Sequence, residues 1–175
     1  IGTLGDVMPL TGENRALVRA GLRVLNEGNR PGLRALARAA GAENKELSSA
    51  NVVFTLVPRL NAAGRMDSPD RAARLLMTAQ DDVAEALAGE IQQCNVRRQE
   101  TETGILTQVI ERLQAEPRLL ADRVLVIDGE NWHPGVVGII AARIVERYGK
   151  PCILLAVKDG QAKGSGRSVK GFSLF

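Results

Sequence analysis

The most constraining feature of this sequence is a pair of short apolar runs on either side of a helical pattern. The runs are VLVI at Val124–Ile127 and CILLAV at Cys152–Val157. Between them, Val136–Tyr148 places apolar residues at the spacing of an amphipathic helix. A strand, a helix and a strand within about 35 residues make a βαβ unit, so we predict two parallel strands joined by a right-handed crossover.

The segment DGENWHPG at Asp128–Gly135 follows the first predicted strand. Ligands of parallel sheets bind outside the carboxyl ends of the strands, so we expect this segment to form the rim of a binding crevice. It holds the single histidine, His133, and Pro134, which fits the first turn of a helix and leaves free N–H groups for an anion. The alternative is that His133 only caps the helix or packs against Trp132.

A glycine-rich motif, KGSGRS, follows at Lys163–Ser168. Gly164 and Gly166 would let the backbone approach a ligand, and successive N–H groups can form an anion-binding nest. Arg167 can donate two hydrogen bonds to one phosphate while Ser165 adds a third. A plain hairpin turn is the alternative. The phosphate-binding interpretation is favoured because both motifs belong to one βαβ module.

Two amphipathic helices are predicted near the start of the chain. One covers Asn14–Asn26, with Thr11 or Asn14 available as its cap, and the other covers Pro31–Ala40. Each has a row of arginines on its polar face, and the two rows are Arg15, Arg19 and Arg23, and Arg30, Arg34 and Arg38. A solvated helix face is the first interpretation of these rows, and contact with phosphates is the second.

The middle of the chain predicts a loop followed by two helices. Pro58 and Gly64 argue against a regular element in Ser48–Arg65, so a structured loop is expected there. A short helix is predicted at Pro69–Met77. A long helix from Asp81 to about Ala115 follows, could serve as a spacer between two modules, and is ended by Pro117.

Composition sets limits on the class of protein. With 45% apolar residues, the 175-residue chain can form one domain or two small ones. The two cysteines are far apart, which argues against a disulfide or zinc site, and no apolar run approaches the length of a membrane span, so a cytoplasmic protein is expected. Ile1 in place of Met indicates a piece of a longer chain, and the end at Phe175 indicates an incomplete last domain.

Four motifs in this order resemble the RecJ family of the DHH phosphoesterase superfamily. They are IGTLGDVMPL, VPRLNAAGRM, HPGVVGIIAARIVERYGKPCILL and KGSGRSVKGF, and together they span nearly the whole chain. The resemblance implies an α/β fold in three parts. These are the mostly helical end of a DHH catalytic domain (1–78), a connector helix (79–116) and a small DHH-associated substrate-binding domain with a βαβ unit and a mixed sheet (117–175).

The resemblance also implies roles for particular residues. Asp6 is similar to the family's last metal-binding aspartate, one of several ligands that hold two Mn²⁺ or Mg²⁺ ions. Arg65 and Arg59 are similar to residues that face phosphates. Ser165 and Arg167 are similar to the residues that bind a terminal 5′ phosphate, and their Gly-Ser-Gly-Arg sequence differs from the GGGH-like sequence of related oligoribonucleases.

We therefore expect the parent to be a metal-dependent 5′-to-3′ exonuclease that acts on single-stranded DNA in repair and recombination. The family's DxD and Asp-His-His motifs are absent from these 175 residues, so the fragment is expected to bind substrate without cleaving it. Two alternatives stay open. One is a phosphodiesterase for oligonucleotides or cyclic dinucleotides, and the other is a non-catalytic scaffold that binds nucleic acid.

Overall fold

The computed structural model describes residues 1–43 and 45–174, so Phe175, the last residue of the predicted final domain, lies outside the described residues. The chain forms two compact units, Ile1–Arg97 and Arg98–Phe175. The long helix α7 (Asp81–Ala115) contributes to both. Within the described ranges, no helix combines the length and the apolar character needed to cross a membrane.

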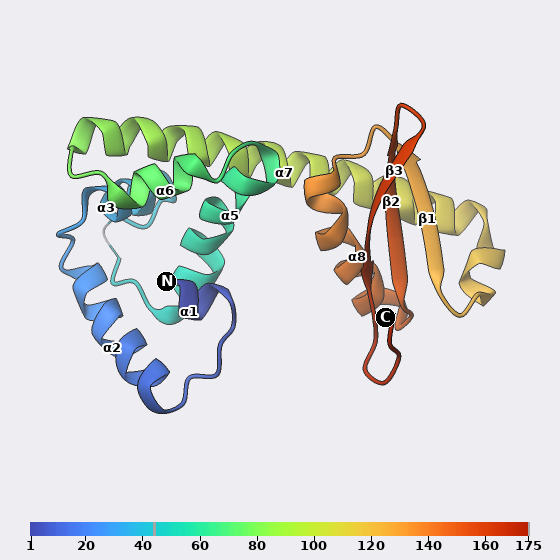
Figure 1. The fold of residues 1–175 in the computed structure, drawn as a ribbon, viewed down its shortest axis with the longest axis horizontal. Helices are drawn as coiled ribbons and strands as arrows, with labels where there is room; N and C mark the ends of the chain where they lie inside the picture. The colour runs from blue at the N-terminus through green and yellow to red at the C-terminus, as the bar shows by residue number, and fades with distance from the viewer. Residues whose placement is uncertain (44, 175) are drawn as a thin grey trace. The chain divides into compact units, whose positions relative to one another are not determined.

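In the described part of the first unit, all regular structure is helical (Figure 1). Its core contains the fully buried side chains of Leu36, Leu56, Leu75 and Ile91. The elements are α1 (Gly2–Gly5), α2 (Gly12–Asn26), α3 (Pro31–Ala39), α4 (Ser49–Asn51), the π-helix η1 (Val52–Leu56), α5 (Val57–Met66), α6 (Asp70–Met77) and the first part of α7. The predicted helices at Asn14–Asn26, Pro31–Ala40 and Pro69–Met77 are therefore present, with ends shifted by one or two residues. Thr11 occupies the N-cap position of α2 without a side-chain capping bond.

The structured loop predicted for Ser48–Arg65 is wrong, because this segment is helical from Ser49 onward. Ser48 and Asn51 form a reciprocal capping box that starts it. Pro58 is the second residue of α5 and comes directly after the π-helix η1, so the residue that cannot donate an N–H follows a turn with wider hydrogen-bond spacing. Among the apolar residues that looked irregular, Val52 and Leu56 at the two ends of the π-helix and Val57 at the start of α5 are buried.

The second unit contains a βαβ unit and a third strand (Figure 1). After the end of α7 come the 3₁₀ turn η2 (Pro117–Ala121), β1 (Leu125–Glu130), α8 (Pro134–Tyr148), β2 (Cys152–Lys158) and β3 (Gln161–Arg167). The sheet order is β1-β2-β3, with β1 parallel to β2 and β2 antiparallel to β3. The predicted βαβ unit, the mixed sheet and the α/β class are confirmed.

The glycine-rich motif lies in a strand, so its predicted nest and the alternative hairpin turn are both wrong for Gly164–Ser168. Gly164 to Arg167 belong to β3 and pair with β2. Successive N–H groups of a strand point in opposite directions and cannot surround one anion. The hairpin turn comes earlier, at Asp159 and Gly160, which have φ angles of 51° and 74° and form the Asp-Gly pair typical of tight hairpins.

The sheet has one buried face and one open face. Along β1 and β2 the fully buried residues alternate with more exposed ones, so that Ile127 and Leu154 are buried while Val126 is 52% exposed. The helix α8 packs against β2 and β3. Residues of β3 that share the face of Leu154 therefore point toward α8.

The thiol of Cys152 lies in this buried face, and desolvation raises its pKa to about 12 from an ordinary value of 9.0. Because the folded-state pKa is the higher one, the neutral thiol contributes its full stability below the pKa of the unfolded chain. That contribution is lost as the pH rises from about 9.0 toward about 12, at about 1.4 kcal/mol per pH unit. The only tryptophan, Trp132, lies in the second unit, so its fluorescence reports urea unfolding there. We expect Cys152→Ala to flatten the loss of stability above pH 9, and an unchanged pH dependence would contradict this.

Candidate functional site

His133 lies at the start of α8 as its N-cap. Its Nδ1 accepts a hydrogen bond of 3.1 Å from the N–H of Gly135, and its carbonyl oxygen accepts one of 3.1 Å from Val136. An Nδ1 that accepts carries no proton, so the neutral ring has its hydrogen on Nε2. The expectation that Pro134 leaves free N–H groups for an anion is therefore wrong, since His133 itself satisfies the first ones.

Ser165 and Arg167 lie on the face of β3 that is turned toward α8. They pair in register with Leu154 and Cys152, which are fully buried against that side. The guanidinium Nη1 of Arg167 donates to Ser165 Oγ at 3.0 Å and to the carbonyl oxygen of Gly166 at 2.8 Å. In residues 1–43 and 45–174, no carboxylate forms an ion pair with Arg167. The hydroxyl and the carbonyl thus orient an exposed cation without neutralising it.

Gly138 is the point of α8 that Ser165 and Arg167 approach. A Cβ atom at position 138 would lie 2.9 Å from Ser165 Oγ and 3.2 Å from Arg167 Nη2. Glycine therefore lets the helix and these two side chains come together. Gly138 was not among the residues expected from the sequence, although an isolated glycine inside a helical pattern is a sign of close packing or function.

Gly164 and Gly166 face the other side of the sheet. A Cβ at Gly164 would lie 2.5 Å from the Leu155 side chain, and one at Gly166 would lie 3.1 Å from Leu174. Together with Ile153 and Phe172 they line a hollow of about 640 Å³. The two glycines thus leave room for Leu155 and Leu174 on the open face of the sheet. Ser165 and Arg167 lie on the opposite face, toward α8.

The turn between β1 and α8 is held by Trp132. Its ring lies so close to Gly129 that a Cβ there would be 2.0 Å from Cε2, and its Nε1 donates to Gln108 Oε1 at 2.8 Å. From α7, Arg112 also donates to the carbonyl oxygen of Asp128 at 2.9 Å. These contacts fix the chain that leads into His133.

A buried carboxylate, also not expected from the sequence, ties α8 to α7. Glu102 is 2% exposed, and its Oε2 accepts a hydrogen bond of 2.6 Å from Arg98. Its Oε1 lies 2.5 Å from Arg143 Nη2 of α8, but among the described residues no donor meets it with hydrogen-bond geometry. This second contact is an ion pair without a hydrogen bond. Nothing in the sequence indicated that Glu102 would be buried, because it is one of several acidic residues in a charged helix.

In the first unit, the two arginines that the resemblance selected lie on α5. Arg59 is half-buried, and its guanidinium donates to Gln92 Oε1 and to the Thr55 carbonyl oxygen, each at 2.7 Å. It thus joins α5 to α7. Arg65 is exposed in the last turn of the same helix. Their predicted contact with phosphates stays a prediction.

Asp6 follows α1 and is exposed, with its backbone N–H bonded to the Gly2 carbonyl oxygen at 2.9 Å. In residues 1–43 and 45–174 there is no group of three or more His, Cys, Asp or Glu side chains that could hold a metal ion. A two-ion site needs several such ligands.

Comparisons with known proteins match both units. Residues 116–175 match the DHHA1 domain family. Over all of its length the chain is 41% identical to the single-stranded-DNA-specific exonuclease RecJ of Bacillus subtilis, and over 99% of its length it is 38% identical to RecJ of Escherichia coli. This chain belongs to the RecJ family. It spans 22% of the Bacillus protein and 31% of the Escherichia coli protein.

Solved RecJ structures have the same fold over this segment. The crystal structure of Thermus thermophilus RecJ in complex with Mn²⁺ matches 98% of the chain with a TM-score of 0.83 and 40% identity, and the chain covers 25% of it. A RecJ exonuclease structure bound to manganese matches 99% of the chain with a TM-score of 0.84 and 38% identity, with 42% of that chain covered. The resemblance expected from the four motifs is thus confirmed.

Proposed function

We propose that the RecJ-family parent of this chain is a metal-dependent 5′-to-3′ exonuclease for single-stranded DNA in repair and recombination. In this proposal the second unit binds the terminal 5′ phosphate of the substrate. The observation that carries it is the close approach of Ser165 and Arg167 to Gly138. The names of the relatives, which are single-stranded-DNA-specific exonucleases, support the substrate class.

The chemistry of this cluster suits a terminal phosphate. Arg167 is exposed, is oriented by two hydrogen bonds from Nη1, and keeps further guanidinium N–H groups for a ligand. A phosphate monoester has three terminal oxygens and more negative charge than a diester, so a forked cation beside a hydroxyl discriminates an end from the interior of a strand. His133 lies at the start of α8, the helix that also carries Gly138, and it offers an Nε2–H donor at that end of the helix.

Asp6 would supply one ligand of the metal centre, and the other ligands would come from the rest of the parent. Mn²⁺ and Mg²⁺ are the ions named for the Thermus structures, and a carboxylate oxygen is a ligand type that both accept. Because one carboxylate cannot hold two ions, the 175-residue chain is expected to bind DNA without hydrolysing it. Cleavage of 5′-phosphorylated DNA by the chain with Mn²⁺, abolished by Asp6→Ala, would contradict this.

The first test of the proposal is binding of single-stranded DNA with and without a 5′ phosphate. Charge-assisted hydrogen bonds contribute about 1.5–3 kcal/mol, so the wild-type chain is expected to prefer the phosphorylated strand by about tenfold or more. Arg167→Ala is expected to remove that preference while leaving affinity for the unphosphorylated strand nearly unchanged. Fluorescence anisotropy of labelled oligonucleotides measures both affinities.

Gly138→Ala provides an independent variant, because its methyl group displaces Ser165 and Arg167 without removing a charge. It is also expected to reduce the phosphate preference. Gly104→Ala is the matched control, since Gly104 lies in a helix of the same unit with nothing within 4 Å of an added Cβ. A wild-type chain with equal affinity for both strands would overturn the proposal, as would a phosphate preference that survives Arg167→Ala.

A further inference from the structure

The helix α2 has three exposed arginines in one row. Arg15, Arg19 and Arg23 are four residues apart, so they follow one another along the helix at steps of about 6 Å. Across residues 1–43 and 45–174, no carboxylate forms an ion pair with any of the three. Three unneutralised guanidinium groups in a row repel one another, so the row lowers helix stability unless something else requires it.

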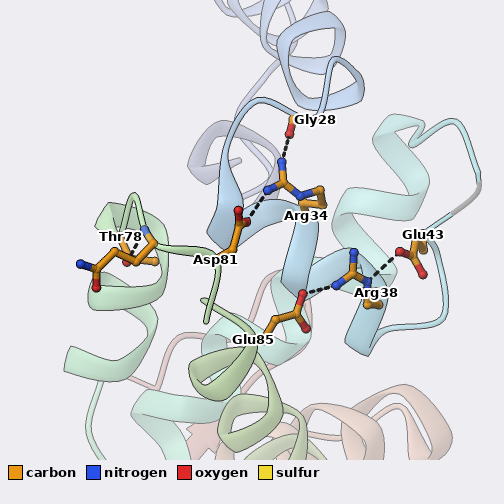
Figure 2. A network of polar contacts seen from close by, with 8 residues as sticks. Gly28, Arg34, Arg38, Glu43, Thr78, Asp81 and Glu85 are labelled. Atoms are coloured by element: carbon orange, nitrogen blue, oxygen red, sulfur yellow. Dashed lines mark hydrogen bonds and ion pairs between the residues drawn. The ribbon is translucent and has the colours of Figure 1, made fainter. Parts of the chain in front are cut away.

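The arginines of the neighbouring helix α3 are used differently (Figure 2). Arg34 donates to the Gly28 carbonyl oxygen at 2.6 Å and pairs with Asp81, the first residue of α7. Arg38 pairs with Glu43 at 2.7 Å and with Glu85 of α7. These ion pairs hold α3 against its neighbours. Among the described residues, Arg34 and Arg38 of the second row are thus neutralised by carboxylates, whereas no arginine of the α2 row is.

The α2 row also borders a groove. A row of small residues, Gly12, Ala16 and Ala20, runs beside the arginine row, and a hollow of about 590 Å³ is lined by these six residues. We call it the α2 arginine groove. A bulky residue at position 16 or 20 would have filled it.

We propose that the α2 arginine groove binds the sugar-phosphate backbone of single-stranded nucleic acid. The inference rests on the proposed function and adds a second contact that does not depend on the terminal phosphate. Guanidinium groups at equal steps match a polymer with one charge on every unit, and each fork can take two oxygens of one phosphate. The small residues beside them leave room for the strand, and the contact carries no base specificity.

An acidic peptide is the competing partner for a basic row. Its charges would lie on flexible side chains with uneven spacing. We therefore expect an acidic peptide to match the evenly spaced arginines less closely than a sugar-phosphate backbone does. Polyglutamate is therefore the competitor that distinguishes the two partners.

The test uses oligothymidylate without a 5′ phosphate, so that the site at Arg167 does not contribute to the difference. Each neutralised phosphate contact on a single strand adds about 0.7 to the slope of log affinity against log salt. The variant Arg15→Gln, Arg19→Gln, Arg23→Gln is expected to bind about tenfold more weakly and to lose about 2 from that slope. The control Lys45→Gln, Arg74→Gln, Arg123→Gln removes the same charge from exposed positions outside the groove and is expected to keep most of the slope.

Equal slopes for the two triple variants would overturn the inference, because net charge alone would then explain binding. Displacement of oligothymidylate by polyglutamate of equal charge concentration would assign the groove to acidic peptides and overturn it too. Neither result concerns the end-phosphate proposal, which is decided by the 5′-phosphate preference of the wild-type chain. Circular dichroism of both variants controls for folding of α2.

Discussion

Replacing Gly32 with alanine is expected to destabilise the first unit by about 3 kcal/mol or more, although the change adds one methyl group. Gly32 is buried in α3, where a Cβ would lie 1.8 Å from the carbonyl oxygen of Leu75 and 2.8 Å from its carbonyl carbon. These are backbone atoms of α6, so no side-chain rotation relieves the overlap. The helices must separate, and overpacking of this kind costs about 1–3 kcal/mol even where side chains can adjust.

The contact between these two helices is reinforced by a neighbouring hydrogen bond. Arg30 Nη2 donates to the Leu76 carbonyl oxygen at 3.0 Å, which satisfies one of the unpaired carbonyls at the end of α6. Separation of the helices would break this bond as well. Amide hydrogen exchange of peptides from α3 and α6 is the measurement, and peptides from the second unit serve as an internal reference.

Gly21→Ala is the matched control for this prediction. Gly21 lies in α2 with nothing within 4 Å of an added Cβ, and alanine in an exposed helix is expected to stabilise it by about 0.5–1 kcal/mol. If Gly32→Ala left hydrogen exchange of α6 unchanged, the close approach of α3 to α6 would be wrong.

The elements with a clean periodic pattern were the ones that the sequence predicted well. The apolar run at Val124–Ile127 and the spacing in Val136–Tyr148 reflect burial on one face, and burial is what forms β1 and α8. The long helix α7 was predicted for the same reason. Four motifs in register then indicated the family, which the comparisons confirmed.

The errors fall where local propensity and tertiary packing disagree. Proline and glycine in Ser48–Arg65 resemble loop signals, but Pro58 lies within a continuous helical segment, directly after the π-helix η1. In β3, glycines that disfavour a strand are accepted because Leu155 and Leu174 fill the space that side chains would take. Gly138 was not predicted as a site residue, because glycine is needed there for the close approach of Ser165. Ser165 lies 27 positions later in the chain, and no periodic pattern in the sequence predicts that the two residues meet.

The sequence also did not predict the ion pair that links α8 to α7. Glu102 looks like one of the many charges of α7, yet its side chain is only 3% exposed and it lies between Arg98 and Arg143. Arg98 is itself 12% exposed, whereas Arg143 is half-exposed. Glu102 therefore neutralises a second largely buried charge, and through Arg143 it connects the helix that carries Gly138 to α7.

Glu102→Gln is expected to destabilise the second unit by about 3 kcal/mol, because it removes the negative charge that Glu102 places beside the largely buried guanidinium of Arg98. The change keeps the size of the side chain, so a cavity is not the cause. Trp132 fluorescence in urea measures the stability of this unit, and Glu100→Gln, at an exposed position two residues earlier, is expected to change it by less than about 0.5 kcal/mol.

A double-mutant cycle separates charge burial from other effects. Arg98→Met alone is expected to be destabilising, since it leaves Glu102 with only the partly exposed Arg143. The double variant Arg98→Met, Glu102→Leu is expected to be more stable than the sum of the single changes predicts, because it removes both buried charges and replaces them with apolar groups. Additive effects would show that the two side chains do not compensate each other, and α8 would then owe its position to apolar packing alone.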